Sequence, residues 1–423
     1  MSEGIVANPN DFLKKALEAQ GGDSARGIYL WLIDDIVGII DNISGDDTKS
    51  FDPSLFPKVE QLFNLIISVI KGEKSPEIND SALTYVFNTT LGKTIDSFVA
   101  FSLRVARATG HVPKKWGQEK YERFFNIGID AYIWFGCFLP QIIFLDKDYA
   151  ESKVGQFVDR NYNDFEWRMF IEGYLSGQRF YKDVYFLMRP HYIKALDHKV
   201  LNERMDENLV HHVAIGYLHG YEALQKDNPN GEISLFWKML SEAKVLEKTD
   251  RWLEAIGFFW SITPRTIKKE KNEENNVTKE EKNKIIEFWK WAYDNRDYVK
   301  NQLGENYDSF LSKLAELTLL LEQIDSDSEK WLLLSAPHVN KHHHSTFFLE
   351  YLTKFEDEES IKRLGRIFLK LLEKNTPMYH SENILLLIER LYKVGEKDVA
   401  DEICTIYGKR EVDLLKELWQ KNQ

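Results

Sequence analysis

Apolar residues recur every three or four positions along most of the chain, a spacing typical of amphipathic α-helices. Over residues 56–70 the apolar side chains form one helix face, Pro57 suits the first turn, and Gly72 marks the end. The same spacing predicts further helices over residues 83–109, 119–137, 165–188, 201–225, 235–245 and 250–260. No run alternates apolar and polar residues with the β-branched enrichment of a strand, so the pattern predicts no sheet.

Toward the C-terminus the predicted helices come in pairs. Ser381 suits an N-cap, Gly395 suits the turn between two helices, and Gly408 closes the second helix. Residues 345–355 and 360–373 form the preceding pair. No strict repeat length emerges. We therefore predict an all-α fold, in the form of an irregular α-solenoid or helical-repeat array of antiparallel helix pairs.

A charged segment interrupts the pattern. Residues 267–284 are dominated by Lys, Glu and Asn, which is typical either of a mobile linker or of a solvated helix start. Thr278 and Glu281 fit a capping box. We expect an aromatic-rich N-terminal helical array over residues 1–266, this charged segment over 267–284, and C-terminal helical-repeat hairpins over 285–423.

Composition narrows the class of protein. The 423 residues are 43% hydrophobic and 13% aromatic, which is enough for a large core and excludes global disorder. Lys and Arg number 55 against 67 Asp and Glu, so 55 − 67 gives a net charge of −12, the wrong sign for a nucleic-acid coat. Two cysteines, Cys137 and Cys404, exclude a disulfide scaffold and suit a reducing compartment. With no convincing signal or membrane segment, we expect a cytoplasmic protein.

Four histidines, His338, His342, His343 and His344, form the densest group of metal-ligand side chains. His338 and His342 are four positions apart, a spacing that places two ligands on one helix face. No glutamate completes an H-E-x-x-H pattern, and Pro337 lies just upstream. The alternatives are a polar loop between helices and a contact with a partner, and we expect no metal.

Arg204 and His211 are a second candidate pair. They lie seven positions apart, about two helical turns, so both side chains would face the same way. The pair resembles that of HEPN-type nucleases, which place an Arg and a His on one helix to stabilise a phosphate and to act as acid or base. Met205 stands where that motif has a polar residue, and His212 and His219 repeat the spacing. A structural helix and a degenerate ribonuclease therefore both stay open.

The chain carries no other catalytic signature. It has no G-x-x-x-x-G-K-[ST], no G-x-G-x-x-G and no G-x-S-x-G motif, so we expect no cofactor and no catalytic residue of those classes. The cysteines and the aromatic clusters have apolar neighbours in sequence, which favours roles in helix packing.

Several stretches resemble a known group of proteins. They include Asn-Thr-Thr-Leu-Gly-Lys-Thr-Ile-Asp-Ser-Phe at residues 88–98, Leu-Pro-Gln-Ile-Ile-Phe-Leu-Asp-Lys-Asp at 139–148, and the ending from Leu391 to Trp419. These segments are similar to the C-terminal helical-repeat region of large bacterial anti-phage defence proteins, of the STAND ATPase or sirtuin-like effector families.

The resemblance implies a non-catalytic, protein-binding role. In that group the helical region recognises a phage protein, while an N-terminal effector carries the activity. The partners it implies are a phage component and an effector, separately encoded or covalently linked. An assembly scaffold without a sensing role is the remaining alternative.

Overall fold

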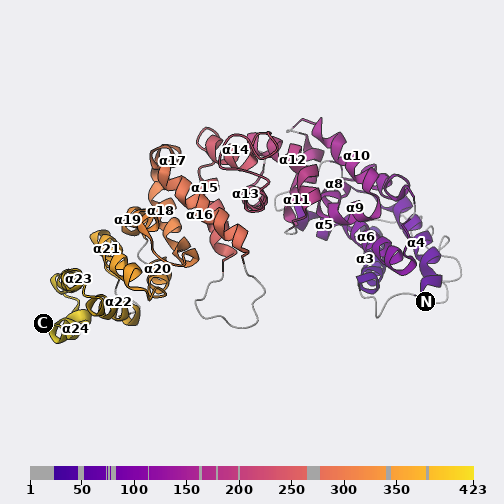
Figure 1. Ribbon diagram of the computed structural model, residues 1–423. Coiled ribbons are helices and arrows are strands. Elements are labelled where there is room, and N and C mark those ends of the chain that lie inside the picture. The colour runs from indigo at the N-terminus through magenta and orange to yellow at the C-terminus, as the bar shows by residue number, and fades with distance from the viewer. Residues whose placement is uncertain are drawn as a thin grey trace. The chain divides into compact units, whose positions relative to one another are not determined.

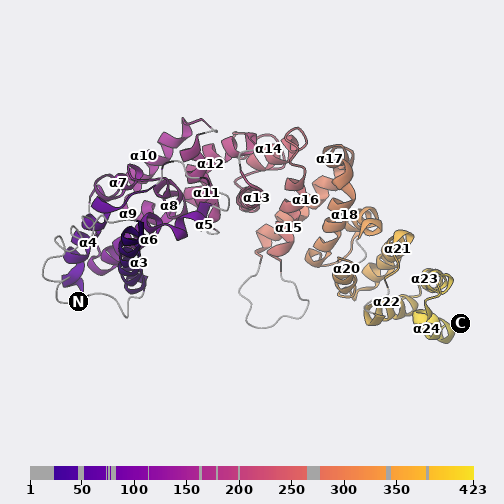
Figure 2. The same ribbon diagram turned by 180° about the vertical axis from the view of Figure 1, so that it is seen from behind.

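The computed structural model describes residues 23–45, 52–72, 74, 77, 82–112, 114–161, 164–177, 180–198, 201–263, 277–339, 344–377 and 381–423. Within these ranges every regular element is helical, and an isolated bridge between Asp227 and Ile233 is the only β-type pairing. The predicted all-α fold class is confirmed (Figures 1 and 2). None of the described helices has both the length and the apolarity needed to cross a bilayer.

The chain forms two compact units, Met1–Leu209 and Val210–Gln423, and helix α13 (Glu203–Leu218) contains the division between them. Of the predicted charged segment, the described residues 277–284 belong to the second unit. Residues 264–276 lie outside the described residues. Thr278 caps α16, and its reciprocal bonds with Glu281 confirm the predicted capping box.

The first unit is built entirely from helices in its described residues. Its elements are α3 (Asp23–Gly45), η1 (Pro53–Leu55), α4 (Phe56–Val69), α5 (Ala82–Asn88), α6 (Thr90–Thr109), η2 (Gly117–Tyr121), α7 (Glu122–Phe125), α8 (Asp130–Cys137), α9 (Leu139–Leu145), α10 (Lys147–Val158), α11 (Phe165–Ser176) and α12 (Lys182–Asp197).

Helices predicted as long and continuous are broken in this unit. The prediction over residues 83–109 was wrong at Thr89, which ends α5 and caps α6 by accepting a bond from the Gly92 amide at 2.9 Å. The prediction over 165–188 likewise splits into α11 and α12 after Gly177. Apolar spacing continues through such breaks because both helices bury a face against the same core.

Aromatic side chains fill the core of the first unit. The ring of Phe98 stacks on Trp116 with centroids 5.9 Å apart, and Phe124 meets Phe98 edge-on. Buried polar atoms of these residues are paired, since Trp116 Nε1 donates to Ser102 Oγ at 3.2 Å and Tyr121 Oη donates to the Ala131 carbonyl at 3.0 Å. The aromatic surplus of the sequence therefore serves helix packing here.

The second unit continues the helical pattern through the rest of the described chain. Its elements after α13 are α14 (Leu235–Glu242), α15 (Asp250–Ser261), α16 (Lys279–Asp294), α17 (Arg296–Leu303), η3 (Gly304–Asn306), α18 (Tyr307–Glu316), η4 (Leu317–Leu320), α19 (Ser326–Ser335), η5 (Ala336–His338), α20 (His344–Leu352), α21 (Glu358–Lys374), α22 (Ser381–Lys393), α23 (Lys397–Lys409), η6 (Asp413–Leu415) and α24 (Lys416–Lys421).

Basic side chains link successive helix pairs of this unit. Lys354 donates to the Leu319 carbonyl, Arg390 to the Thr353 carbonyl, and Arg410 to the Leu372 carbonyl, over sequence separations of 35, 37 and 38 residues. Each bond satisfies a carbonyl at or just beyond the C-terminal end of an earlier helix, where no intrahelical donor exists. Arg390 and Arg410 thus both join α22 and α23 to the preceding pair, α20 and α21, while Lys354 joins that pair to η4.

Candidate functional site

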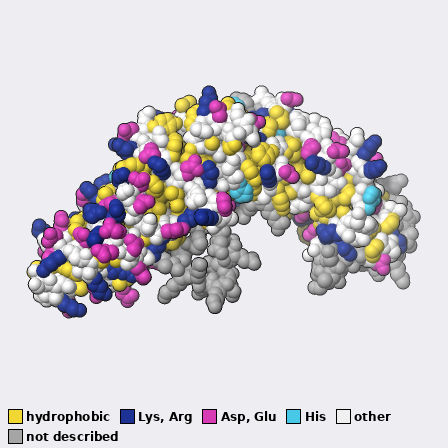
Figure 3. All heavy atoms as spheres, in the orientation of Figure 1, with side chains coloured by type: hydrophobic (Ala, Val, Ile, Leu, Met, Phe, Trp, Pro, Cys, Tyr) yellow, Lys and Arg dark blue, Asp and Glu magenta, His cyan; other side chains and the backbone are white. Residues whose placement is uncertain are grey.

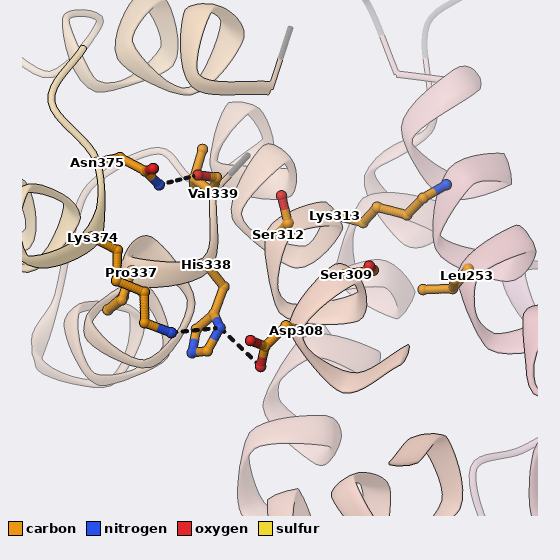
Figure 4. Close-up of a pocket in the computed structure, with 10 residues that line it drawn as sticks. All are labelled: Leu253, Asp308, Ser309, Ser312, Lys313, Pro337, His338, Val339, Lys374 and Asn375. Atoms are coloured by element: carbon orange, nitrogen blue, oxygen red, sulfur yellow. Dashed lines mark hydrogen bonds and ion pairs between the residues drawn. The ribbon is translucent and has the colours of Figure 1, made fainter. Parts of the chain in front are cut away.

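A cleft of about 640 Å³, lined by both polar and apolar side chains, lies within the second unit. Figure 4 shows the lining residues, which come from α15, from α18, from η5 with the residue that follows it, and from the end of α21 with the residue that follows it. The charged and polar residues of its lining include Asp308, Ser309, Lys313, His338, Lys374 and Asn375. The cleft is therefore assembled from four segments of the chain.

Local structure places these groups. On α18, Asp308, Ser309 and Lys313 lie at positions i, i+1 and i+5, and the helix buries its opposite face through Phe310 and Leu314. The turn after η5 is fixed to the end of α21, because Asn375 Nδ2 donates to the Val339 carbonyl at 2.5 Å. The cleft walls are thus held by buried side chains and a buried hydrogen bond.

His338 stands at the centre of the charged groups. Its Nδ1 lies 3.0 Å from Asp308 Oδ1 and 3.4 Å from Lys374 Nζ (Figure 4). The imidazole is 17% exposed, whereas Asp308 is 67% exposed. One ring nitrogen therefore faces a carboxylate and an ammonium group together, and it can form a hydrogen bond with only one of them at a time.

Lys313 extends away from His338 toward α15 (Figure 4). Glu254 of α15 accepts a bond from His211 Nε2 at 2.6 Å. This hydrogen bond, followed by the charges of His211 and Lys313, lowers the pKa of Glu254, with burial opposing the shift. Glu254 is thus already paired with His211, and the Lys313 ammonium interacts with it only over a longer distance.

Of the nuclease-like pair, the structure uses His211 as a packing residue. The His211 ring stacks on Phe258 with centroids 4.8 Å apart, in addition to its bond with Glu254. Arg204 is exposed near the start of α13. Across the described ranges, no hydrogen bond or ion pair joins Arg204 to His211, and neither residue lines the cleft.

Only part of the predicted histidine cluster lies within the described residues. His342 and His343 lie outside the described residues, and His344 begins α20. The neighbours of His338 are one carboxylate and one ammonium group, and an ammonium group beside the ring opposes a bound cation. The described part of the chain contains no group of three or more His, Cys, Asp or Glu arranged to hold a metal.

The cysteines lie in packed environments. Cys137 Sγ donates to the Gly173 carbonyl at 3.1 Å, and burial raises the pKa of this thiol to about 12. Cys404 is also buried, and burial raises the pKa of its thiol. A raised pKa disfavours the reactive thiolate, which agrees with the predicted packing role of both residues.

A second cleft, of about 850 Å³, lies in the first unit. Glu122 dominates its chemistry, accepting a bond from Tyr149 Oη at 2.6 Å and pairing with Lys153 at 2.6 Å. The Lys153 ammonium also lies 4.3 Å from the centroid of the Phe125 ring. Glu122, Tyr149 and Lys153 thus already satisfy one another's hydrogen bonds in this cleft.

Sequence spacing did not reveal Asp308, Lys313 or Lys374. Thirty residues separate Asp308 from His338 and 36 separate His338 from Lys374, so no local motif connects them. The sequence signal that relates to this arrangement is the pairing of successive helices. A repeat of roughly 36 residues places side chains of successive pairs next to one another.

Comparison of the chain with protein-family models, with curated proteins and with solved structures found no match in any of the three. The residues that line the cleft of the second unit offer two ammonium groups, an imidazole, a carboxylate and hydroxyls on rigid helices, which suits binding of a polar ligand.

Proposed function

We propose that this chain is a non-catalytic helical-repeat protein that binds another protein. The hydrogen bonds of Lys354, Arg390 and Arg410, which join helices 35 to 38 residues apart in sequence, support the proposal most directly. Helical-repeat proteins stack similar units to present extended surfaces, and protein recognition is their common use.

The surface of the second unit also supports protein binding. Figure 3 shows Lys, Arg, Asp and Glu side chains interspersed over the elements near the C-terminus. Many of these charges are paired on the surface, as Lys362 is with Glu358 at 2.7 Å and Lys330 with Asp327 at 2.9 Å. A surface of mixed sign discriminates among protein partners through charge complementarity.

We further propose that the partner is a phage component and that the chain senses it in a bacterial antiviral defence system, in the cytoplasm. The resemblance of residues 88–98, 139–148 and 391–419 to defence-protein sensor regions supports this step. In the proposed system the chain reports to an effector, either encoded separately or covalently linked.

Affinity purification tests the proposal. The tagged chain is recovered from phage-infected and from uninfected bacterial cells, and co-purifying proteins are identified by mass spectrometry. We expect one phage-encoded protein to be enriched from infected cells and to form a complex with the purified chain on size-exclusion chromatography. If the chain and each enriched candidate elute separately, with no complex between them, the proposed function is wrong.

A further inference from the structure

We propose that the cleft of the second unit binds an acidic segment of the protein partner, with Lys313 and Lys374 receiving its carboxylates. This inference rests on the proposed function and adds the chemistry of the partner. It comes from the arrangement of charges around His338 and from the absence, among the described residues, of a carboxylate oxygen within 4.0 Å of the Nζ of either lysine.

The hydrogen bond that His338 Nδ1 forms determines whether Lys374 can use that nitrogen as an acceptor. The contact of Nδ1 with Asp308 Oδ1, at 3.0 Å, is shorter than its contact with Lys374 Nζ, at 3.4 Å. When Nδ1 carries its proton and donates to Asp308, it has no lone pair left for the ammonium group. Lys374 Nζ then needs another acceptor, and the open side of the cleft is where a ligand carboxylate can supply it.

Lys313 stands in a similar position on the other side of the cleft. Glu254, the carboxylate that Lys313 influences, already accepts the hydrogen bond of His211. In the described residues, no carboxylate oxygen lies within 4.0 Å of the Nζ of Lys313 or of Lys374. By contrast, Lys290 of the same unit pairs with Asp294 at 2.7 Å.

The balance of charge favours an anion. The lining holds two lysines and one aspartate, so 2 − 1 gives +1 before any proton on His338 is counted. Asp308 pairs with the imidazole but is itself 67% exposed, so its charge offsets one of the two ammonium charges. On a chain of net charge −12, this cleft is therefore a local basic site that attracts carboxylates and rejects basic segments.

The neutral groups of the lining fit the same ligand. The Ser309 hydroxyl is exposed on the cleft side of α18, and His338 Nε2 has no partner among the described residues. Both can donate hydrogen bonds to carboxylate or backbone oxygens of a bound segment. The Asn375 amide is engaged with Val339 and fixes the cleft wall.

Fluorescence anisotropy with the full chain tests the proposal. The probe is a labelled short peptide rich in glutamate, compared with a glutamine peptide of matched length and with a single-stranded RNA oligonucleotide. We expect the glutamate peptide to bind more tightly than both, and to weaken as salt is raised. Lys374→Gln and Lys313→Gln should each weaken binding about threefold, and the double variant about tenfold.

Lys290→Gln provides the matched control, because it removes the same charge from the same unit but outside the cleft. It should leave peptide binding unchanged. The proposal is overturned if the glutamate peptide binds no better than the glutamine peptide, if RNA binds more tightly, or if the control weakens binding as much as the cleft variants.

Partner capture separates this inference from the proposed function. If the wild-type chain captures a phage protein and the Lys313→Gln, Lys374→Gln double variant captures it equally well, the acidic-segment inference is wrong and the binding function stands. If the double variant loses the partner while Lys290→Gln retains it, the inference is supported. If no protein binds the wild-type chain, the proposed function itself fails.

Discussion

Gly136 of α8 and Gly173 of α11 lie at a point where the two helix backbones meet with no side chain between them. A Cβ atom at Gly136 would lie 2.2 Å from the Phe170 carbonyl oxygen, and one at Gly173 would lie 2.1 Å from the Ile133 carbonyl oxygen. Both obstacles are backbone atoms, which cannot turn aside as a flexible side chain would. The crossing therefore requires glycine on both helices.

Gly173→Ala should destabilise the first unit by roughly 1–3 kcal/mol, because α8 and α11 must move apart to accept the methyl group. Gly155→Ala on α10 is the matched control, since no atom lies within 4 Å of the Cβ that it would add. That variant should gain up to about 1 kcal/mol from its higher helix propensity. Urea unfolding, monitored by circular dichroism, measures the stability of both variants. Equal effects of the two substitutions would contradict the close backbone contact between α8 and α11.

Asp96 of α6 links the stability of the first unit to pH. Burial, followed by the charge of Asp41, raises the pKa of Asp96 to about 6. The folded state thus takes up this proton more readily than the unfolded chain, so the wild type gains stability as pH falls from about 6 toward the ordinary value of 3.8.

Asp96→Asn should therefore raise the free energy of unfolding by about 1–2 kcal/mol above pH 7, after allowance for partial exposure. Its advantage should vanish near pH 4, where the wild-type carboxyl is protonated. Asp35→Asn, at an exposed position of α3, is the control variant, because it keeps Asp96 and removes a surface carboxylate instead. Parallel urea titrations of the three proteins give the result, and an advantage that persists at pH 4 would refute the role of the charge.

Arg390 should be the most sensitive of the links between helix pairs. Its Nη1 donates to the Thr353 carbonyl at 2.6 Å and to the Phe355 carbonyl at 2.9 Å. Arg390→Met leaves both carbonyls without this donor and should cost about 2 kcal/mol. Lys393→Met, at an exposed position of the same helix, should change stability by less than about 0.5 kcal/mol. A shared thermal midpoint for the two variants would count against the link.

The nuclease alternative makes a different prediction at Arg204 and His211. Because His211 packs on Phe258 and pairs with Glu254, His211→Ala should cost about 1–2 kcal/mol of stability. We expect neither the wild type nor this variant to cleave RNA. Arg204→Ala, at an exposed position, should be nearly neutral. Incubation of each purified protein with labelled RNA is the measurement. RNA cleavage by the wild type that both variants abolish would establish the ribonuclease instead.

Local sequence signals predicted the helices well where capping residues are explicit. Thr278 and Glu281 form the expected capping box, and Gly395 adopts a φ of 85° between α22 and α23, as its predicted turn requires. Such signals act within a few residues of backbone. They are therefore readable without knowledge of the tertiary structure.

Such local signals predicted neither the helix breaks within long apolar runs nor the cleft. Thr89 acts as an N-cap only because α5 and α6 both pack on the core, and the apolar spacing on either side resembles one helix. Asp308, His338 and Lys374 come together only when successive helix pairs stack. The site depends on tertiary packing, which local periodicity does not specify.

Site-specific cross-linking in infected cells tests whether the cleft of the second unit binds a phage protein. A photo-reactive amino acid is placed at Ser309, on the cleft side of α18, and in a parallel strain at Lys397, an exposed position of α23 outside the cleft lining. We expect Ser309 to cross-link to one phage protein through an acidic segment and Lys397 not to do so. Cross-linking of Ser309 to RNA, to no protein, or to the same proteins as Lys397 would contradict it.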